Sequence, residues 1–192
     1  YPAAKGSADA MLEQAIEGVD MLQNNLARAA SLVRGFKQTL VSQVDERMCE
    51  FDAVEIARAL LANLHPVLCR VPVTPLLSGV SSLRVRSSPG ALNQVLTNLL
   101  INSAQHAFEG VAKPCIDIEF SEHPGGWLLR YSDNGVGIPP ALESRIFEPF
   151  FTTRRGRGGT GLGLSIVHNL VTQQLGGELR VSSGEGGGLA FV

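Results

Sequence analysis

Apolar residues in the first part of the chain repeat at alternating steps of three and four. Over residues 7–43 this spacing predicts one long helix, with an apolar seam formed by Val19, Leu22, Leu26, Ala29, Val33, Phe36 and Leu40. A strict heptad seam favours a coiled coil or helical bundle over an amphipathic helix that packs on its own domain. No other predicted helix has a matching seam, so we expect this helix to pair with a second chain.

The pattern changes near Asp45, and from there short strands alternate with helices. We expect helices at residues 54–69, 88–108, 140–146 and 162–175, and strands at 48–52, 71–78, 83–87, 115–121, 127–132, 179–182 and 189–192. Ser88 and Pro89 form a good helix start, because serine caps an N-terminus and proline suits the first turn. Pro72 and Pro75 indicate that the 71–78 strand is short or lies at a sheet edge.

Two glycine clusters, at residues 133–137 and 159–164, flank an aromatic block at 147–151 and a basic segment that contains Arg154, Arg155 and Arg157. Glycine is entropically costly in a folded chain, so this density indicates backbone N–H groups held close to a ligand. A polyphosphate fits best, because backbone amides and helix N-termini bind anions. Asp-Asn-Gly alone is also a common hairpin turn, so the order of the clusters is more specific than either cluster.

Asn98 and Asn102 lie four residues apart on the helix expected at 88–108, and therefore on one face. That face borders an apolar stripe formed by Leu92, Leu96, Leu99, Leu100, Ser103 and Ala107. Asparagine has a poor helix propensity, so both residues need a reason to be there. One reading is a pair of structural, hydrogen-bonded amides. The other is a carbonyl oxygen donated to a hard cation such as Mg²⁺.

Composition, net charge and cysteine spacing limit the classes of protein to which the chain can belong. The 192 residues are 44% hydrophobic and 18% charged, which is typical of one or two globular domains. A net charge of −2 gives no indication of a general nucleic-acid binder. Cys49, Cys69 and Cys115 have neither metal nor disulfide spacing, which fits a reducing cytoplasm. No apolar run in the sequence is long enough to cross a bilayer, and no signal peptide is visible.

These motifs make the chain similar to a two-component sensor histidine kinase. Residues 96–104 resemble the N box, 133–137 the G1 box, 148–153 the F box and 159–164 the G2 box. The resemblance implies a Bergerat fold at 46–192, an α/β two-layer sandwich with a mixed sheet. The heptad helix, residues 1–45, resembles the second helix of the dimerisation domain. Other Bergerat-fold ATPases, such as topoisomerase subunits and a heat-shock chaperone, generally lack this F box and G2 sequence.

The resemblance implies a site for ATP and Mg²⁺. Asp133 would accept a hydrogen bond from the adenine amino group, and Asn102, with Asn98 nearby, would hold Mg²⁺ against the phosphates. The implied nucleotide-binding residues are Asn98, Asn102, Gln105, His106, Asp133, Gly135, Gly137, Ile138, Phe150, Thr152, Thr153, Arg154, Arg157, Gly159, Thr160, Gly161, Leu162, Gly163 and Leu164. The arginines would belong to a mobile lid, although a solvated charge run is an equal reading.

The sequence departs from the family at two points. Gln105 stands where many members carry a basic residue, and the following His106 is either its substitute or a neutral, packed histidine. No histidine lies on the heptad helix, where the phosphoacceptor region is expected; the four present are His65, His106, His123 and His168. We therefore expect a fragment, ending inside a strand at Val192, that binds ATP but does not label itself.

The resemblance also implies partners. They are ATP or ADP, a cognate response regulator, and a dimerisation-domain helix of the same or a second protomer, with a homodimer as the assembly and no nucleic acid. This region would be cytoplasmic, with a parent kinase that is either soluble or anchored in the inner membrane. The alternatives are a degenerate nucleotide-binding regulatory module and a mechanical ATPase of the wider Bergerat class. The intact asparagine and glycine set argues against degeneracy.

Overall fold

The computed structural model describes residues 16, 18, 19, 21–23, 48–69, 71–152, 160–183 and 188–192. The few described residues before position 24 are helical, and Ile16, Val19 and Leu22 among them are more than half exposed. Most of the predicted heptad seam, including Leu26 to Leu40, lies outside the described residues. The prediction of a paired helix therefore stays a prediction.

Five strands form one mixed sheet in the order β2-β4-β5-β7-β6. They are β2 Thr74–Gly79, β4 Cys115–His123, β5 Gly126–Asp133, β6 Val181–Ser183 and β7 Leu189–Phe191. β2 runs parallel to β4, and every other neighbouring pair is antiparallel. β1 (Cys49–Asp52) and β3 (Arg84–Ser87) form a separate antiparallel pair. The edge position predicted for the proline-containing strand is confirmed, because β2 is the first strand of the sheet.

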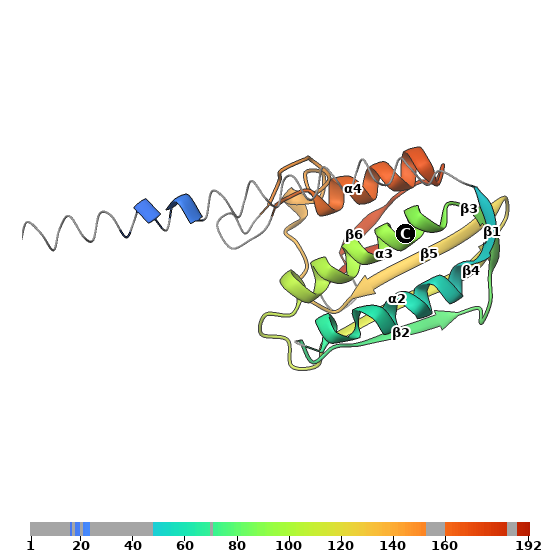
Figure 1. Cartoon of the computed structure of the whole chain (residues 1–192), viewed down its shortest axis with the longest axis horizontal. Helices are drawn as coiled ribbons and strands as arrows, with labels where there is room; N and C mark the ends of the chain where they lie inside the picture. The colour runs from blue at the N-terminus through green and yellow to red at the C-terminus, as the bar shows by residue number, and fades with distance from the viewer. Residues whose placement is uncertain are drawn as a thin grey trace, which may run out of the picture.

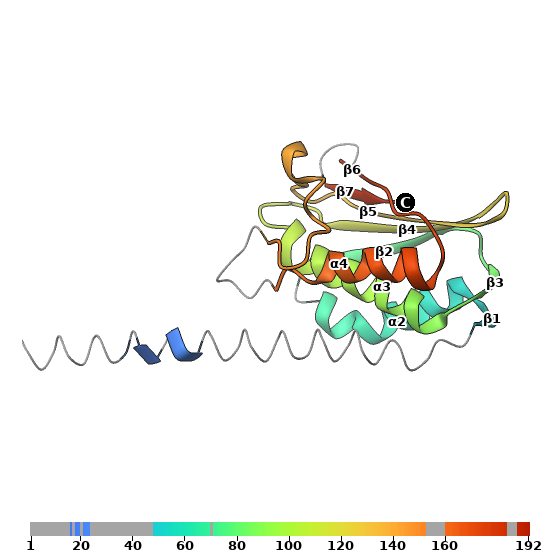
Figure 2. The same ribbon diagram turned by 90° about the horizontal axis from the view of Figure 1, so that it is seen from above.

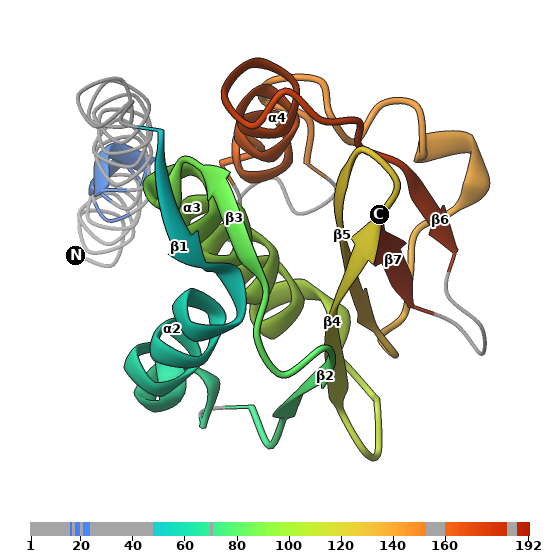
Figure 3. The same ribbon diagram turned by 90° about the vertical axis from the view of Figure 1, so that its right-hand side faces the viewer.

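Three helices cover one face of this sheet: α2 Ala53–Leu68, α3 Pro89–Asn102 and α4 Gly163–Asn169. Figure 1 shows α2 and α3 lying over the sheet roughly along the direction of β4 and β5, and Figures 2 and 3 show the helix layer on one side of the sheet layer. Five-residue π-helical turns continue α3 and α4, at Ser103–Ala107 and Leu170–Gln174. The predicted two-layer α/β sandwich with a mixed sheet is confirmed.

The core forms where the apolar stripe of α3 meets alternate residues of β4. Ile116, Ile118 and Phe120 are fully buried, because successive side chains of a strand point to opposite faces and these three point to the helices. The facing leucines of α3 are Leu92, Leu96, Leu99 and Leu100, each 3% exposed or less. This packing fixes α3, and with it the asparagines beside the stripe, against the centre of the sheet.

The helices α2 and α3 both begin at side-chain caps. The Ser88 hydroxyl accepts a hydrogen bond from the Ala91 amide at 3.2 Å, which confirms the predicted start of α3. Asp52 caps α2 by accepting from the Val54 amide at 2.9 Å. The same carboxylate accepts from the Ser82 hydroxyl at 2.6 Å and so ties α2 to the chain that precedes β3.

Some predicted boundaries are wrong. The strand expected from residue 71 begins at Thr74, because residues 71–73 turn and the Val73 amide donates to the Val71 carbonyl. The helix expected at 140–146 is a 3-10 turn, Pro140–Leu142, followed by further turns. Seven residues are too few to sustain an isolated α-helix. The ends of the helices expected at 88–108 and 162–175 are π-helical instead of α-helical. Among the described helices, none has the length and apolar character needed to cross a bilayer.

We predict that Asp52 stabilises the fold in a pH-dependent way. The Ser82 hydroxyl, and then the Leu83 amide, lower the pKa of the Asp52 carboxyl from 3.8 to about 2. A lowered folded-state pKa gives stability that is complete above pH 3.8 and is lost as the pH falls toward 2. Thermal unfolding should show Asp52→Asn, which keeps a capping side chain, melting below the wild type at neutral pH. The gap should close near pH 2; a gap that is constant with pH would contradict this prediction.

Candidate functional site

The carboxylate of Asp133 lies at the end of β5, buried between the sheet and the end of α3. Only 8% of the residue is exposed. The Ser103 hydroxyl donates to Oδ2 at 2.7 Å, and the Gly135 amide donates to Oδ1 at 3.0 Å. A carboxylate has about four acceptor positions, so each oxygen keeps one for a further donor. The site is therefore a fixed acceptor able to hold a ligand N–H group.

A third residue completes this cluster. The Tyr131 hydroxyl donates to Ser103 Oγ at 2.8 Å. Burial raises the pKa of the Tyr131 phenol well above its usual range; the Ser103 hydrogen bond partly opposes the rise, and the charge of Asp133 adds to it. The phenol therefore stays protonated and remains a donor at any physiological pH.

The first glycine cluster brings the loop after β5 against the π-helical turn that follows α3. The Val136 amide donates to the Ala107 carbonyl at 2.8 Å. A β-carbon on Gly135 would lie 2.5 Å from the same carbonyl oxygen, a distance that side chains do not adopt. Gly137 has a φ of +66°, and its β-carbon would be 2.9 Å from the Gly188 carbonyl oxygen. These glycines are thus required by close backbone packing within the protein, whatever ligand lies beside them.

The two asparagines predicted to hold a cation occupy successive turns of α3. Asn98 Oδ1 accepts from Gln94 Nε2 at 3.2 Å, while Asn98 Nδ2 is buried without a partner among the described residues. The Asn102 side chain faces the first residue of α4: a β-carbon on Gly163 would lie 3.1 Å from Asn102 Oδ1. The structure therefore brings the N box and the second glycine cluster together. A buried, unused amide beside them fits a polar ligand, because unpaired buried donors are costly.

A backbone hydrogen bond joins the aromatic block at residues 147–151 to the second glycine cluster. The Phe150 amide donates to the Gly161 carbonyl at 2.9 Å, and both residues have positive φ values, 66° and 68°. For phenylalanine such a conformation costs about 1–3 kcal/mol, so the surrounding contacts must enforce it. One such contact holds the next residue: the Arg145 guanidinium lies 4.6 Å from the ring centre of Phe151. The predicted lid residues Thr153, Arg154, Arg157 and Gly159 lie outside the described residues.

The other predicted site residues differ in exposure. Thr160 Oγ1 accepts from the Leu162 amide at 3.3 Å, so that amide is engaged within the loop. Thr152 is half-buried, and Ile138 and Leu164 pack partly against the core. Gln105 is exposed and His106 is half-buried, both in the π-helical turn after α3. The turn therefore holds both of the residues at which the sequence departs from the family pattern.

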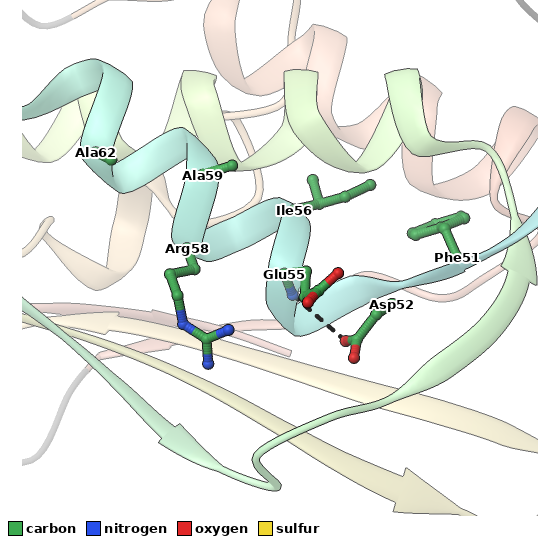
Figure 4. Close-up of a pocket in the computed structure, with 7 residues that line it drawn as sticks. All are labelled: Phe51, Asp52, Glu55, Ile56, Arg58, Ala59 and Ala62. Atoms are coloured by element: carbon green, nitrogen blue, oxygen red, sulfur yellow. Dashed lines mark hydrogen bonds between the residues drawn. The ribbon is translucent and has the colours of Figure 1, made fainter.

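Two of the hollows on the described surface differ in chemistry. The larger, of about 540 Å³, lies against β1 and α2, with Phe51 and Ile56 on its apolar side. Arg58 extends away from these two residues, and the Asp52 carboxylate is turned to cap the helix (Figure 4). The smaller, of about 210 Å³, is lined by Asp133 and Asn134 at the strand ends. Asp117, Arg130 and Ser132 also line the smaller hollow, and because they alternate with the buried residues of β4 and β5, this hollow lies on the sheet face away from the helices and from the Ser103 contact.

Sequence reasoning missed the functional context of Ser103 and Tyr131. The sequence predicts Ser103 only as part of the apolar stripe of α3 and Tyr131 only as part of a strand. The available signal was a serine inside an otherwise apolar stripe, directly after Asn102. Its partner Asp133 is 30 residues away, so only the packing of α3 on β5 reveals the contact.

Comparison with known proteins identifies the class. The family model HATPase_c, described as histidine kinase-, DNA gyrase B- and HSP90-like ATPase, matches residues 87–192, more than half of the chain. The catalytic domain of the histidine kinase ThkA superposes with a TM-score of 0.67 at 27% identity, covering 76% of this chain and 92% of that one. The chain belongs to this family, and the resemblance to a sensor histidine kinase is confirmed.

Curated relatives narrow the class further. The two-component sensor PprA of Pseudomonas aeruginosa is 43% identical over 112 residues, or 56% of this chain and 12% of that protein. The sensor histidine kinase ZraS of Escherichia coli K12 is 41% identical over 109 residues, or 56% of this chain and 22% of that protein. A putative sensor protein of Shewanella frigidimarina is 31% identical over 183 residues, or 92% of this chain and 25% of that protein. The chain contains an ATP-binding catalytic domain of the sensor histidine kinase type and spans at most a quarter of these relatives.

We predict that Gly135→Ala destabilises the protein through overpacking against Ala107. The added β-carbon has no room, so the free energy of unfolding should fall by about 1–3 kcal/mol. Gly90→Ala is the matched control, because a β-carbon there meets nothing within 4 Å. That control should be neutral or stabilising by up to about 1 kcal/mol. Urea denaturation of the two variants measures the difference; equal stability would show that the loop yields freely.

Proposed function

We propose that this chain binds Mg-ATP and, within a longer sensor kinase, transfers the γ-phosphoryl group to a histidine of a dimerisation domain for relay to a response-regulator aspartate. The observation that carries the proposal is the buried Asp133 carboxylate, held by two donors and with acceptor positions left over. In water-poor surroundings such an acceptor selects a ligand that offers N–H groups. Adenine presents such a donor, its amino group, at position 6 of the purine, where guanine presents a keto oxygen instead.

The phosphate end of the site would form where α3 meets α4. Asn102, and Asn98 one turn before it, would supply amide oxygens to Mg²⁺, which prefers hard oxygen ligands. Backbone amides of Thr160, Gly161 and Gly163, just before and at the start of α4, would face the phosphates, and the Leu162 amide would join them on leaving Thr160 Oγ1. The arginines Arg154 and Arg157 would then neutralise charge as the lid closes. Phosphoryl transfer depends mainly on such positioning and neutralisation. The attacking nucleophile would be the histidine of the dimerisation domain, so this domain would supply none.

The remaining assignments extend to parts of the parent protein. Residues 1–45 would form the second helix of the dimerisation domain, and residues 46–192 the catalytic domain. The heptad seam would pair with a helix of the same or a second protomer, giving a homodimer. We place the domain on the cytoplasmic side, where ATP and the response regulator are found, whether or not the parent kinase is anchored in a membrane.

The proposal is tested by offering the chain a phosphoacceptor. It is incubated with γ-labelled ATP, with and without the histidine-bearing dimerisation domain of its own parent. We expect acid-labile label on that domain and none on the chain itself. Steady phosphate release without transfer would instead favour a mechanical ATPase, and stoichiometric self-labelling would contradict the assignment as a fragment.

Asp133→Asn supplies the specific variant for this experiment, since it replaces an acceptor oxygen by a donor. Losing a charged hydrogen bond should weaken ATP binding by about 10- to 150-fold and reduce transfer accordingly. Glu119→Gln is the control: it removes a carboxylate from neighbouring β4, on the face of the sheet away from the helices. Its affinity for ATP should stay within about twofold of the wild type.

We predict that the contribution of Mg²⁺ to ATP binding traces to Asn102. Removing an amide oxygen from the metal should weaken binding with Mg²⁺ while leaving the contacts to the base. Calorimetry of Asn102→Ala with ATP, in Mg²⁺ and in chelator, should show a loss only in Mg²⁺. Asn93→Ala, an exposed asparagine on the same helix, is the control and should bind like the wild type. An equal loss in both conditions would remove Asn102 from the metal site.

A further inference from the structure

We propose that Ser103 and Tyr131 are positioning residues for base recognition, whose hydroxyls form a directed relay that orients the Asp133 carboxylate and makes the site select a 6-amino purine. The inference rests on the proposed function, in which Asp133 reads the base. It adds two residues that make no contact with the ligand themselves. Their effect is exerted through the position and the acceptor character of the carboxylate.

The relay has one direction, set by the number of protons available. Each hydroxyl carries a single proton. Tyr131 donates its proton to Ser103 Oγ at 2.8 Å, and Ser103 donates its own to Asp133 Oδ2 at 2.7 Å. The phenol stays protonated because it is buried, so this direction does not reverse. Asp133 is left as an acceptor only, facing whatever donor the ligand presents.

The relay also fixes the plane of the carboxylate. Ser103 holds Oδ2 from the helix layer, while the Gly135 amide holds Oδ1 from the loop. Ser103 and Tyr131 are 4% and 1% exposed, so bulk water does not compete for these bonds. The ring of Tyr131 lies 6.4 Å from that of Phe191 on β7, which restrains the phenol in turn. A carboxylate held from both sides meets an incoming N–H group without reorganising.

The π-helical turn explains how a serine on α3 reaches this position. Ser103 is its first residue and bonds to Asp133, and Ala107 is its last and accepts from the Val136 amide. One wide turn therefore sets both the carboxylate and the glycine loop beside it. Such turns are rare and are frequently found at functional sites. Since Asn102 directly precedes Ser103, the same turn relates the base end of the site to the phosphate end.

The test compares ATP with inosine triphosphate, in which a keto oxygen replaces the amino group at position 6 of the purine and N1 carries a proton. Calorimetry with Mg²⁺ gives both affinities for the wild type, Ser103→Ala, Ser103→Thr and Tyr131→Phe. We expect Ser103→Ala to lose about 10-fold in ATP affinity, as for a hydrogen bond to a charged group, with little change for inosine triphosphate. Tyr131→Phe, which removes one oxygen, should lose about threefold. Ser103→Thr keeps the hydroxyl and should restore the preference for ATP.

The controls separate positioning from general loosening of the fold. Ser87→Ala removes another buried serine, on β3, and should leave the ratio of the two affinities unchanged. An equal loss for both nucleotides, or an unchanged ratio in folded Ser103→Ala and Tyr131→Phe, would overturn the relay. If Ser103→Ala does not fold, Tyr131→Phe decides the question alone. A wild type that binds neither nucleotide would overturn the proposed function itself; a wild-type preference that depends on Asp133 but on neither hydroxyl would overturn only the relay.

Discussion

The arrangement of the site depends on a charge that is buried at the edge of an apolar core. Asp133 ends a central strand, and a carboxylate in that place is costly unless protein donors replace water. The donors come from two directions, the Ser103 hydroxyl on the helix layer and the Gly135 amide in the loop. Satisfying this one group therefore constrains both layers of the sandwich at the same point.

Several features follow from that constraint. The helix must approach β5 closely, and its end widens into a π-helical turn whose Ala107 carbonyl holds the Val136 amide. The loop can lie that close only because position 135 has no side chain. On the other side of α3, Asn102 meets Gly163 at the start of α4, which joins the second glycine cluster to the same framework. The two ends of the site are thus parts of one packed unit.

In our proposal, different residues of this domain bind the base and the phosphates. The base would be read by a buried carboxylate that protein hydrogen bonds already hold in place before any ligand arrives, which lowers the cost of ordering it on binding. The phosphate side would be formed by the start of α4 and the chain just before it, where the Phe150 amide donates a hydrogen bond to the Gly161 carbonyl.

The sequence by itself determined the class of protein, the order of the elements and the caps at Ser88 and Pro89, because motif spacing, alternation and capping are local properties. It also predicted that Asp133 ends a strand. It did not predict the π-helical turns or the short 3-10 turn at Pro140–Leu142, since these depend on packing rather than on residue pattern. The long-range partner of Asp133 was decided only by the tertiary structure. Ser103 lies 30 residues away along the chain, and its hydroxyl faces the carboxylate because the leucines of α3 pack against β4.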